Sequence, residues 1–96
     1  MLTGKQRSYL RALANEIEPI FQIGKGGINE NMIVQFNEAL EAREIIKVSV
    51  LNNSLEDPKE LCNEASRLTG SDIVQVIGKK FVLYKESEKN KVIELP

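Results

Sequence analysis

Apolar residues recur at helical spacing in three separate parts of the chain. The first part begins with a capping box, in which Thr3 and Gln6 can exchange side-chain and backbone hydrogen bonds at a helix N-terminus. Leu10, Leu13 and Ile17 then recur at helical spacing and form the apolar stripe of this helix. Pro19 is expected to end this helix, because the residue before a proline disfavours helical dihedral angles.

The other two predicted helices have well-defined ends. Asn29 is placed as the N-cap of a second helix, because its short polar side chain can accept a hydrogen bond from a first-turn amide. Asp57 has the same place before a third helix, with Pro58 in the first turn, and Gly70 suits the left-handed position after the last turn. The inward faces of these helices are expected to consist of Met32, Ile33, Phe36 and Leu40, and of Leu61, Ala65 and Leu68.

Four short runs rich in β-branched and aromatic residues predict strands. They are residues 20–23, 45–51, 73–77 and 81–84. Gly78-Lys79 separates the last two runs, and glycine at the first position of a two-residue connection favours a type II′ hairpin. In the register of that hairpin Val74 pairs with Leu83, and Val74 is expected to share one face of the sheet with Val76.

The order of elements is helix, strand, helix, strand, helix, strand, strand, which predicts an α/β (α+β) fold. Two strand–helix–strand crossovers imply parallel pairing and place the second and third helices on one face of the sheet. The other face carries Lys47 and Gln75 and is too polar for a deeply buried layer. The expected architecture is a two-layer sandwich with a four-stranded mixed sheet, formed by one domain over residues 1–85 and followed by a charged C-terminal tail over residues 86–96.

The composition removes several classes of function. Histidine is absent and Cys62 is the only cysteine, so the commonest general base, the commonest metal ligand and a thiolate cluster are all missing. We expect no metal site and no cofactor, and Cys62 is expected to fill the core. No apolar run has membrane-spanning length, the N-terminus lacks the apolar core of a secretory signal, and a lone cysteine suits a reducing compartment. These features predict a cytoplasmic protein without membrane contact.

The net charge of −1 conceals a division of charge along the chain. Residues 1–28 carry a charge of +2, residues 29–72 a charge of −5, and residues 73–96 a charge of +2. A basic surface built from the two ends of the chain would attract phosphate locally. A mixed, solvated surface is the alternative interpretation of the same pattern.

Three glycines in four residues follow the first predicted strand, in the run Gly24-Lys25-Gly26-Gly27. Before a helix N-terminus, such a loop can approach a ligand closely and direct free N–H groups and the positive end of the helix dipole toward an anion. The Walker pattern fails because Ile28 follows the last glycine, and the Rossmann pattern fails because Asn29 stands where its third glycine should be. The Gly-x-x-Gly spacing instead matches the backbone clamp of KH domains. The alternative is a tight turn that needs glycine for geometry alone.

Several spaced motifs, spread over nearly the whole chain, together resemble those of a known family. They are Leu2-Thr3-Gly4-Lys5-Gln6-Arg7, Leu10-Arg11, the glycine run, residues 39–48, and Val76-Ile77-Gly78 with Phe81-Val82-Leu83-Tyr84. Over residues 2 to about 85 the chain closely resembles the CRM domain in its bacterial YhbY-type form. The resemblance implies a fold like the C-terminal domain of bacterial translation initiation factor three. It also implies binding of structured RNA, specifically ribosomal RNA in precursors of the large subunit, without catalysis or a small-molecule substrate.

The residues expected to bind RNA are those of the glycine loop, together with lysines and arginines in or beside the family motifs. They are Gly24, Lys25, Gly26, Gly27, Lys5, Arg7, Arg11, Lys79 and Lys80. For the cations outside the loop, an ordinary solvated surface position is the alternative. Lys47 on the polar sheet face is a further candidate contact, and Arg43 is expected to interact with the C-terminus of its helix. Tyr84 is expected to cover the open sheet face rather than stack on a base.

Two other functions stay open beside an RNA-binding, monomeric assembly factor for the large ribosomal subunit. One is a protein-interaction module that docks through the acidic second helix, which carries Glu30, Glu38 and Glu41. The other is a phosphate-ligand enzyme that uses carboxylates such as Glu30 near the glycine loop. The enzyme is the weakest of the three, because no nucleophile–base pair accompanies the loop.

Overall fold

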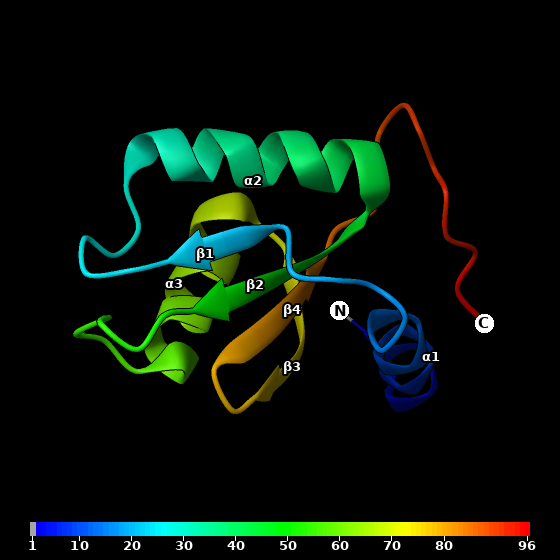
Figure 1. Cartoon of the computed structure of the whole chain (residues 1–96). Coiled ribbons are helices and arrows are strands. Elements are labelled where there is room, and N and C mark those ends of the chain that lie inside the picture. The colour runs from blue at the N-terminus through cyan, green and yellow to red at the C-terminus, as the bar shows by residue number, and fades with distance from the viewer. Residues whose placement is uncertain (1) are drawn as a thin grey trace.

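A four-stranded mixed sheet forms the centre of the computed structural model, which describes residues 2–96 (Figure 1). The elements are α1 (Gly4–Ala14), β1 (Phe21–Ile23), α2 (Glu30–Arg43), β2 (Ile45–Val50), α3 (Pro58–Thr69), β3 (Asp72–Ile77) and β4 (Lys80–Tyr84). The strand order is β1-β2-β4-β3; β1 is parallel to β2, and β4 is antiparallel to both β2 and β3. Helices α2 and α3 cover one face, and α1 lies against the other. The predicted fold class, element order and mixed sheet are confirmed. The second crossover does not give the predicted parallel pair, because β4 lies between β2 and β3.

Local capping explains where each helix begins. Thr3 Oγ1 accepts a hydrogen bond from the Gln6 amide, and Gln6 Oε1 accepts one from the Thr3 amide, both at 3.1 Å, so the predicted capping box is present. Asn29 Oδ1 accepts the Met32 amide at 2.8 Å, and Asp57 caps α3 in a similar way. These bonds satisfy first-turn amides that have no acceptor inside the helix.

The first helix ends earlier than the position of Pro19 predicts. Helix α1 ends at Ala14, and in the turn that follows Ile17 N donates to Ala14 O at 3.3 Å. The chain then becomes extended, and Ile20 N donates to Lys47 O at 3.0 Å. Pairing of this linker with β2 therefore requires the chain to leave the helix before the proline is reached.

The main core lies between the sheet and the helices α2 and α3. Phe21 packs edge to face on Phe36, with ring centroids 4.9 Å apart. The fully or almost fully buried members are Ile23, Phe36, Leu40, Ile46, Val48, Val50, Leu61, Cys62, Ala65, Phe81 and Leu83. The predicted stripe of α2 is confirmed, but Leu68 is 42% exposed and Thr69 is buried instead. The reason is that the inward stripe of α3 continues at four-residue spacing from Ala65 to Thr69.

A smaller apolar cluster lies on the other face of the sheet, under α1 and the C-terminal segment. It consists of Leu2, Leu10, Ala14, Ile45, Val74, Val82, Tyr84 and Ile93. The prediction that Val74 pairs with Leu83 and shares a face with Val76 is wrong. A β-bulge after Ile73 shifts the register, so that Ile73 pairs with Leu83 and Val74 joins the cluster under α1. Tyr84 is 4% exposed and covers this face, so its ring is inaccessible to a base.

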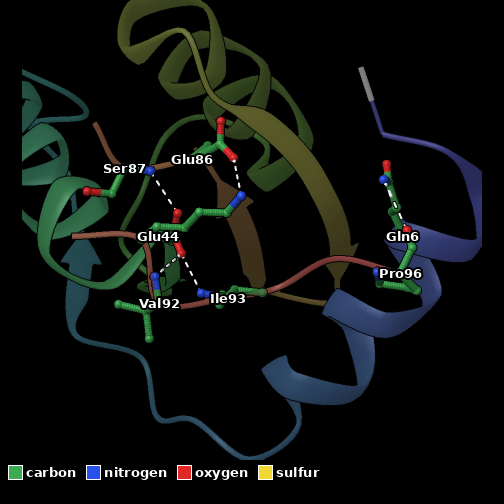
Figure 2. Close-up of polar contacts among 8 residues, drawn as sticks. Gln6, Glu44, Glu86, Ser87, Val92, Ile93 and Pro96 are labelled. Carbon is green, nitrogen blue, oxygen red and sulfur yellow. Dashed lines mark hydrogen bonds and ion pairs between the residues drawn. The ribbon is translucent and has the colours of Figure 1, made fainter. Parts of the chain in front are cut away.

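Two carboxylates at the end of α2 hold the C-terminal segment, residues 85–96, against the domain. Glu44 is fully buried, and its carboxylate accepts the amides of Ser87 at 2.8 Å, Val92 at 2.7 Å and Ile93 at 2.6 Å (Figure 2). Glu41 accepts the Ser87 hydroxyl at 2.7 Å and two further backbone amides at 3.0 Å. The segment is thereby placed so that Ile93 packs into the second cluster.

Glu44 combines a strained backbone with a stabilised charge. Its φ of 67° makes it the one residue other than glycine with positive φ in the described part of the chain. Desolvation raises the pKa of its carboxyl group, but the three backbone donors outweigh that effect and hold the pKa below its ordinary value. The buried side chain is therefore a carboxylate whose role is to bind the C-terminal segment.

Cys62 is buried in the main core, and desolvation raises the pKa of its thiol to about 12. A thiol in this environment stays protonated and unreactive. We expect Cys62→Ala to lower the free energy of unfolding by about 1 kcal/mol, the cost of a small cavity, and to leave ligand binding unchanged. Chemical denaturation and a binding titration check the two effects. Loss of binding by a folded Cys62→Ala variant would show that α3 contributes to a site.

Candidate functional site

The glycine run forms a tight turn between β1 and α2, at the cyan end of β1 (Figure 1). Gly27 N donates to Gly24 O at 3.1 Å, which closes the turn. Lys25 and Gly26 occupy its exposed tip, whereas Gly27 is buried. The turn therefore projects one lysine and one flexible residue into solvent from a fixed base.

The three glycines have different structural needs. A Cβ on Gly24 would lie 3.3 Å from Asn53 Oδ1, so the space there is tight. Gly27 has a φ of 67°, and a Cβ on it would lie 2.8 Å from a Glu56 carboxylate oxygen. Gly26 has open space around it and no positive φ. Gly27 is thus needed for the turn because of its positive φ, and a side chain at Gly24 would require Asn53 to move. The two tip residues are free to contact a ligand.

The charges around the loop favour contact at its tip only. The first-turn amides of α2 point toward the loop, and Asn29 already accepts one of them, from Met32. The Glu56 carboxylate lies beside Gly27, and Glu30 is exposed at the start of α2. A phosphate enclosed by the loop would meet the Glu56 charge, so the geometry suits a phosphate that touches Lys25 from outside.

The hairpin lysines lie at the same end of the sheet as the glycine loop. Leu51 N donates to Ile23 O at 2.8 Å, just before the loop, and Val50 N donates to Lys79 O at 2.6 Å. These bonds connect the ends of β1 and β2 with the hairpin between β3 and β4. Lys79 and Lys80 are exposed there, so the structure brings them to the same end of the sheet as Lys25.

Three other predicted site residues lie far from the loop. Lys5, Arg7 and Arg11 are on α1, which lies at the opposite end of the sheet from the loop that joins β1 to α2 (Figure 1). The structure therefore does not bring these three cations together with the loop, because α1 packs on the second apolar cluster, and their part in binding stays a prediction. The last turn of α1 leads instead to the open sheet face, where Asn15, Lys47, Gln75 and Lys80 line one hollow.

The predicted cations are not neutralised by ion pairs in the described part of the chain. Across residues 2–96 one ion pair is present, between Lys91 and Glu86 at 3.1 Å. The same residues contain no group of three or more metal-ligating side chains. None of the helices in this range is both long and apolar enough to cross a membrane.

Sequence reasoning missed the role of Glu41, which it assigned to the acidic side of the second helix, and it gave Glu44 no structural role. Their partners lie 43 to 49 residues further along the chain. No spacing rule connects positions so far apart, since local patterns extend over only a few residues. The run of apolar residues near the C-terminus, which includes Ile93, was the available signal that this segment packs on the domain.

These features define a small α+β domain with an exposed glycine turn, lysines at one end of the sheet that form no ion pair within residues 2–96, and a partly open second face. The CRS1/YhbY (CRM) domain model matches residues 2–85, and the chain belongs to this family.

Relatives match over nearly the full length. The chain is 57% identical over 96 residues to a Bacillus subtilis protein named "Probable RNA-binding protein YqeI", and the match covers 100% of both chains. It is 36% identical over 95 residues to a Haemophilus influenzae protein named "RNA-binding protein", covering 99% of this chain and 95% of the relative. The solution structure of SAV1595 from Staphylococcus aureus is similar with a TM-score of 0.82 and 62% identity, covering 100% of both chains.

Proposed function

We propose that this chain binds RNA and that the tip of the glycine loop contacts the phosphate backbone. The observation that carries the proposal is that Gly24 and Gly27 close the turn while Lys25 and Gly26 stay exposed and unconstrained. Lys79 and Lys80, at the same end of the sheet, would extend the contact along the RNA backbone. Phosphate contacts of this kind position a protein on RNA through charge and shape rather than sequence.

The partner that we propose is ribosomal RNA within precursors of the large ribosomal subunit, bound in the cytoplasm by a monomer. The resemblance to YhbY-type CRM domains supports this partner, and the relatives that span the whole chain are named as RNA-binding proteins. The protein would act by binding, without catalysis, because no histidine and no nucleophile–base pair accompany the loop.

Sedimentation of a cell lysate through a sucrose gradient tests this function. We expect the protein to travel with precursor particles of the large subunit and to leave them after nuclease treatment, because RNA supplies the contact. A protein that remains on the particles after the RNA is digested would instead dock on a protein, through the exposed side of α2. If the protein stays at the top of the gradient, the proposal that it binds precursors of the large ribosomal subunit is wrong.

Arg7→Gln together with Arg11→Gln tests whether α1 takes part in binding. Each phosphate contact releases counterions, so loss of two contacts is expected to flatten the slope of log affinity against log salt by about 1.5. Titrations of labelled ribosomal RNA at several salt concentrations measure the slope. Lys59→Gln with Arg67→Gln removes two exposed cations from α3 and is the matched control. Equal slopes in the α1 variant and the control would assign the α1 arginines to the solvated surface.

A further inference from the structure

A hollow of about 490 Å³ lies away from the glycine loop, where the linker between α1 and β1 faces the end of α2. Its apolar walls come from Ile17 and Ile20 of the linker, Ala42 of α2, Ile45 of β2 and Val92 of the C-terminal segment. This volume lies within the range of small-molecule sites, which is about 300–1,000 Å³. The hollow is therefore large enough for one nucleotide.

Two walls of the hollow, Ile20 and Val92, are held in place although they are exposed. Ile20 is 39% exposed and Val92 is 64% exposed, so apolar surface at this place is open to solvent. The backbone of Ile20 is bonded to Lys47 O at 3.0 Å, and that of Val92 is bonded to the Glu44 carboxylate at 2.7 Å (Figure 2). A ligand would thus meet a preformed surface and would not have to order its walls.

Three charged side chains border these apolar walls. Arg43 in the last turn of α2 and Lys47 of β2 are cations, and Glu18 of the linker is a carboxylate. None of them forms an ion pair within residues 2–96, where the one such pair is between Lys91 and Glu86. The site therefore offers an apolar surface, two free cations and one hydrogen-bond acceptor.

We propose that this hollow binds a single unpaired nucleotide of RNA. The base would lie against the aliphatic walls, and its phosphate would contact Arg43 and Lys47. Glu18 can accept a hydrogen bond from the exocyclic amino group of adenine, cytosine or guanine. A nucleotide matches all three features of the site, whereas a fatty acid has no donor for Glu18 and an inorganic anion has no apolar part. The inference deepens the proposed RNA binding and adds a base-reading contact distant from the glycine loop.

Titration of the ¹⁵N-labelled full chain with AMP, followed by NMR, tests the proposal. We expect saturable amide shifts at Ile20, Lys47 and Val92 with a Kd near the millimolar range, as is typical of a single small ligand, and much weaker shifts with ribose 5-phosphate, which lacks the base. Arg43→Gln is expected to weaken AMP binding about tenfold, because a charge-assisted hydrogen bond is lost. Arg67→Gln, in the last turn of α3, is the matched control.

A second variant fills the hollow without disturbing the core. Ala42 is exposed on α2, so Ala42→Phe is expected to fold normally and to abolish the AMP shifts. Equal binding of AMP and ribose 5-phosphate, or AMP shifts that persist in Ala42→Phe, would overturn the inference. Shifts of the same amides on concentrating the free protein would also overturn it, because a second copy of the chain would then occupy the hollow.

The variant with Lys25→Asp and Gly26→Asp separates this inference from the proposed function of the loop. AMP binding in the hollow is expected to be unchanged in that variant. If RNA binding depends on the loop but the protein does not bind AMP, the proposal that the hollow binds a nucleotide is wrong and the proposed function of the loop is supported. If the loop variant binds both AMP and RNA normally, the proposed function of the loop is wrong and the nucleotide site in the hollow is supported.

Discussion

Replacing Lys25 and Gly26 together by aspartate is expected to weaken binding to precursor ribosomal RNA by roughly a hundredfold, because it adds repulsion to the loss of a phosphate contact. The fold should be unchanged, since Gly26 has open space around it and no positive φ, and both residues lie on an exposed tip. Circular dichroism and thermal melting check the fold. Fluorescence anisotropy at one fixed salt concentration measures the affinity.

Two further variants make this result interpretable. Lys25→Ala removes the charge without adding repulsion and is expected to weaken binding by a smaller factor than the double variant. Lys59→Asp with Asn63→Asp makes the same change of three charges on the exposed side of α3 and should affect binding much less. Wild-type affinity in a folded loop variant would show that the loop is a structural turn without RNA contact. The open sheet face with Lys47 and Lys80 would then be the better candidate for the RNA-binding surface.

Glu44→Gln is expected to lower the free energy of unfolding by about 2 kcal/mol, and the melting temperature by roughly 10 °C. The amide keeps the shape of the side chain, but its NH₂ group would face backbone N–H donors that now bind a carboxylate oxygen. The C-terminal segment should therefore loosen, and faster hydrogen exchange at Ser87, Val92 and Ile93 is expected. Glu38→Gln, on the exposed side of the same helix, is the matched control.

Lowering the pH should remove from the wild-type protein the stability that the Glu44 carboxylate contributes. Desolvation raises the pKa of Glu44, but hydrogen bonds from the C-terminal segment outweigh that effect and lower the pKa. Hydrogen bonds from the same segment lower the pKa of Glu41 and outweigh desolvation there as well. A carboxyl group with a lowered pKa stabilises the folded state above its unfolded pKa, about 4.3, and loses that effect as the pH falls through its folded pKa. Unfolding midpoints measured from pH 7 to pH 3 should therefore fall less steeply for Glu44→Gln than for the wild type. Parallel curves would show that Glu44 is not a structural anchor.

Features that depend on neighbouring residues could be predicted from the order of residue types. The capping box of Thr3, the cap at Asn29, the left-handed Gly70 and the position of the glycine turn were all predicted correctly. Each depends on bonds between residues a few positions apart, so the spacing of residue types is enough to indicate it. Membership of the family was equally accessible, because its motifs are local runs at characteristic distances.

Contacts between distant parts of the chain could be learned only from the three-dimensional structure. Spacing could not show that α1 packs at the far end of the sheet from the glycine loop, nor that the bulge after Ile73 turns Val74 toward α1. It also could not show that Glu44 binds a segment more than 40 residues away. These outcomes depend on which packing of helices on the sheet buries the most apolar surface while pairing every buried polar group. Local sequence patterns cannot predict this packing, because it depends on contacts between residues that are far apart in the chain and meet only in the folded sheet.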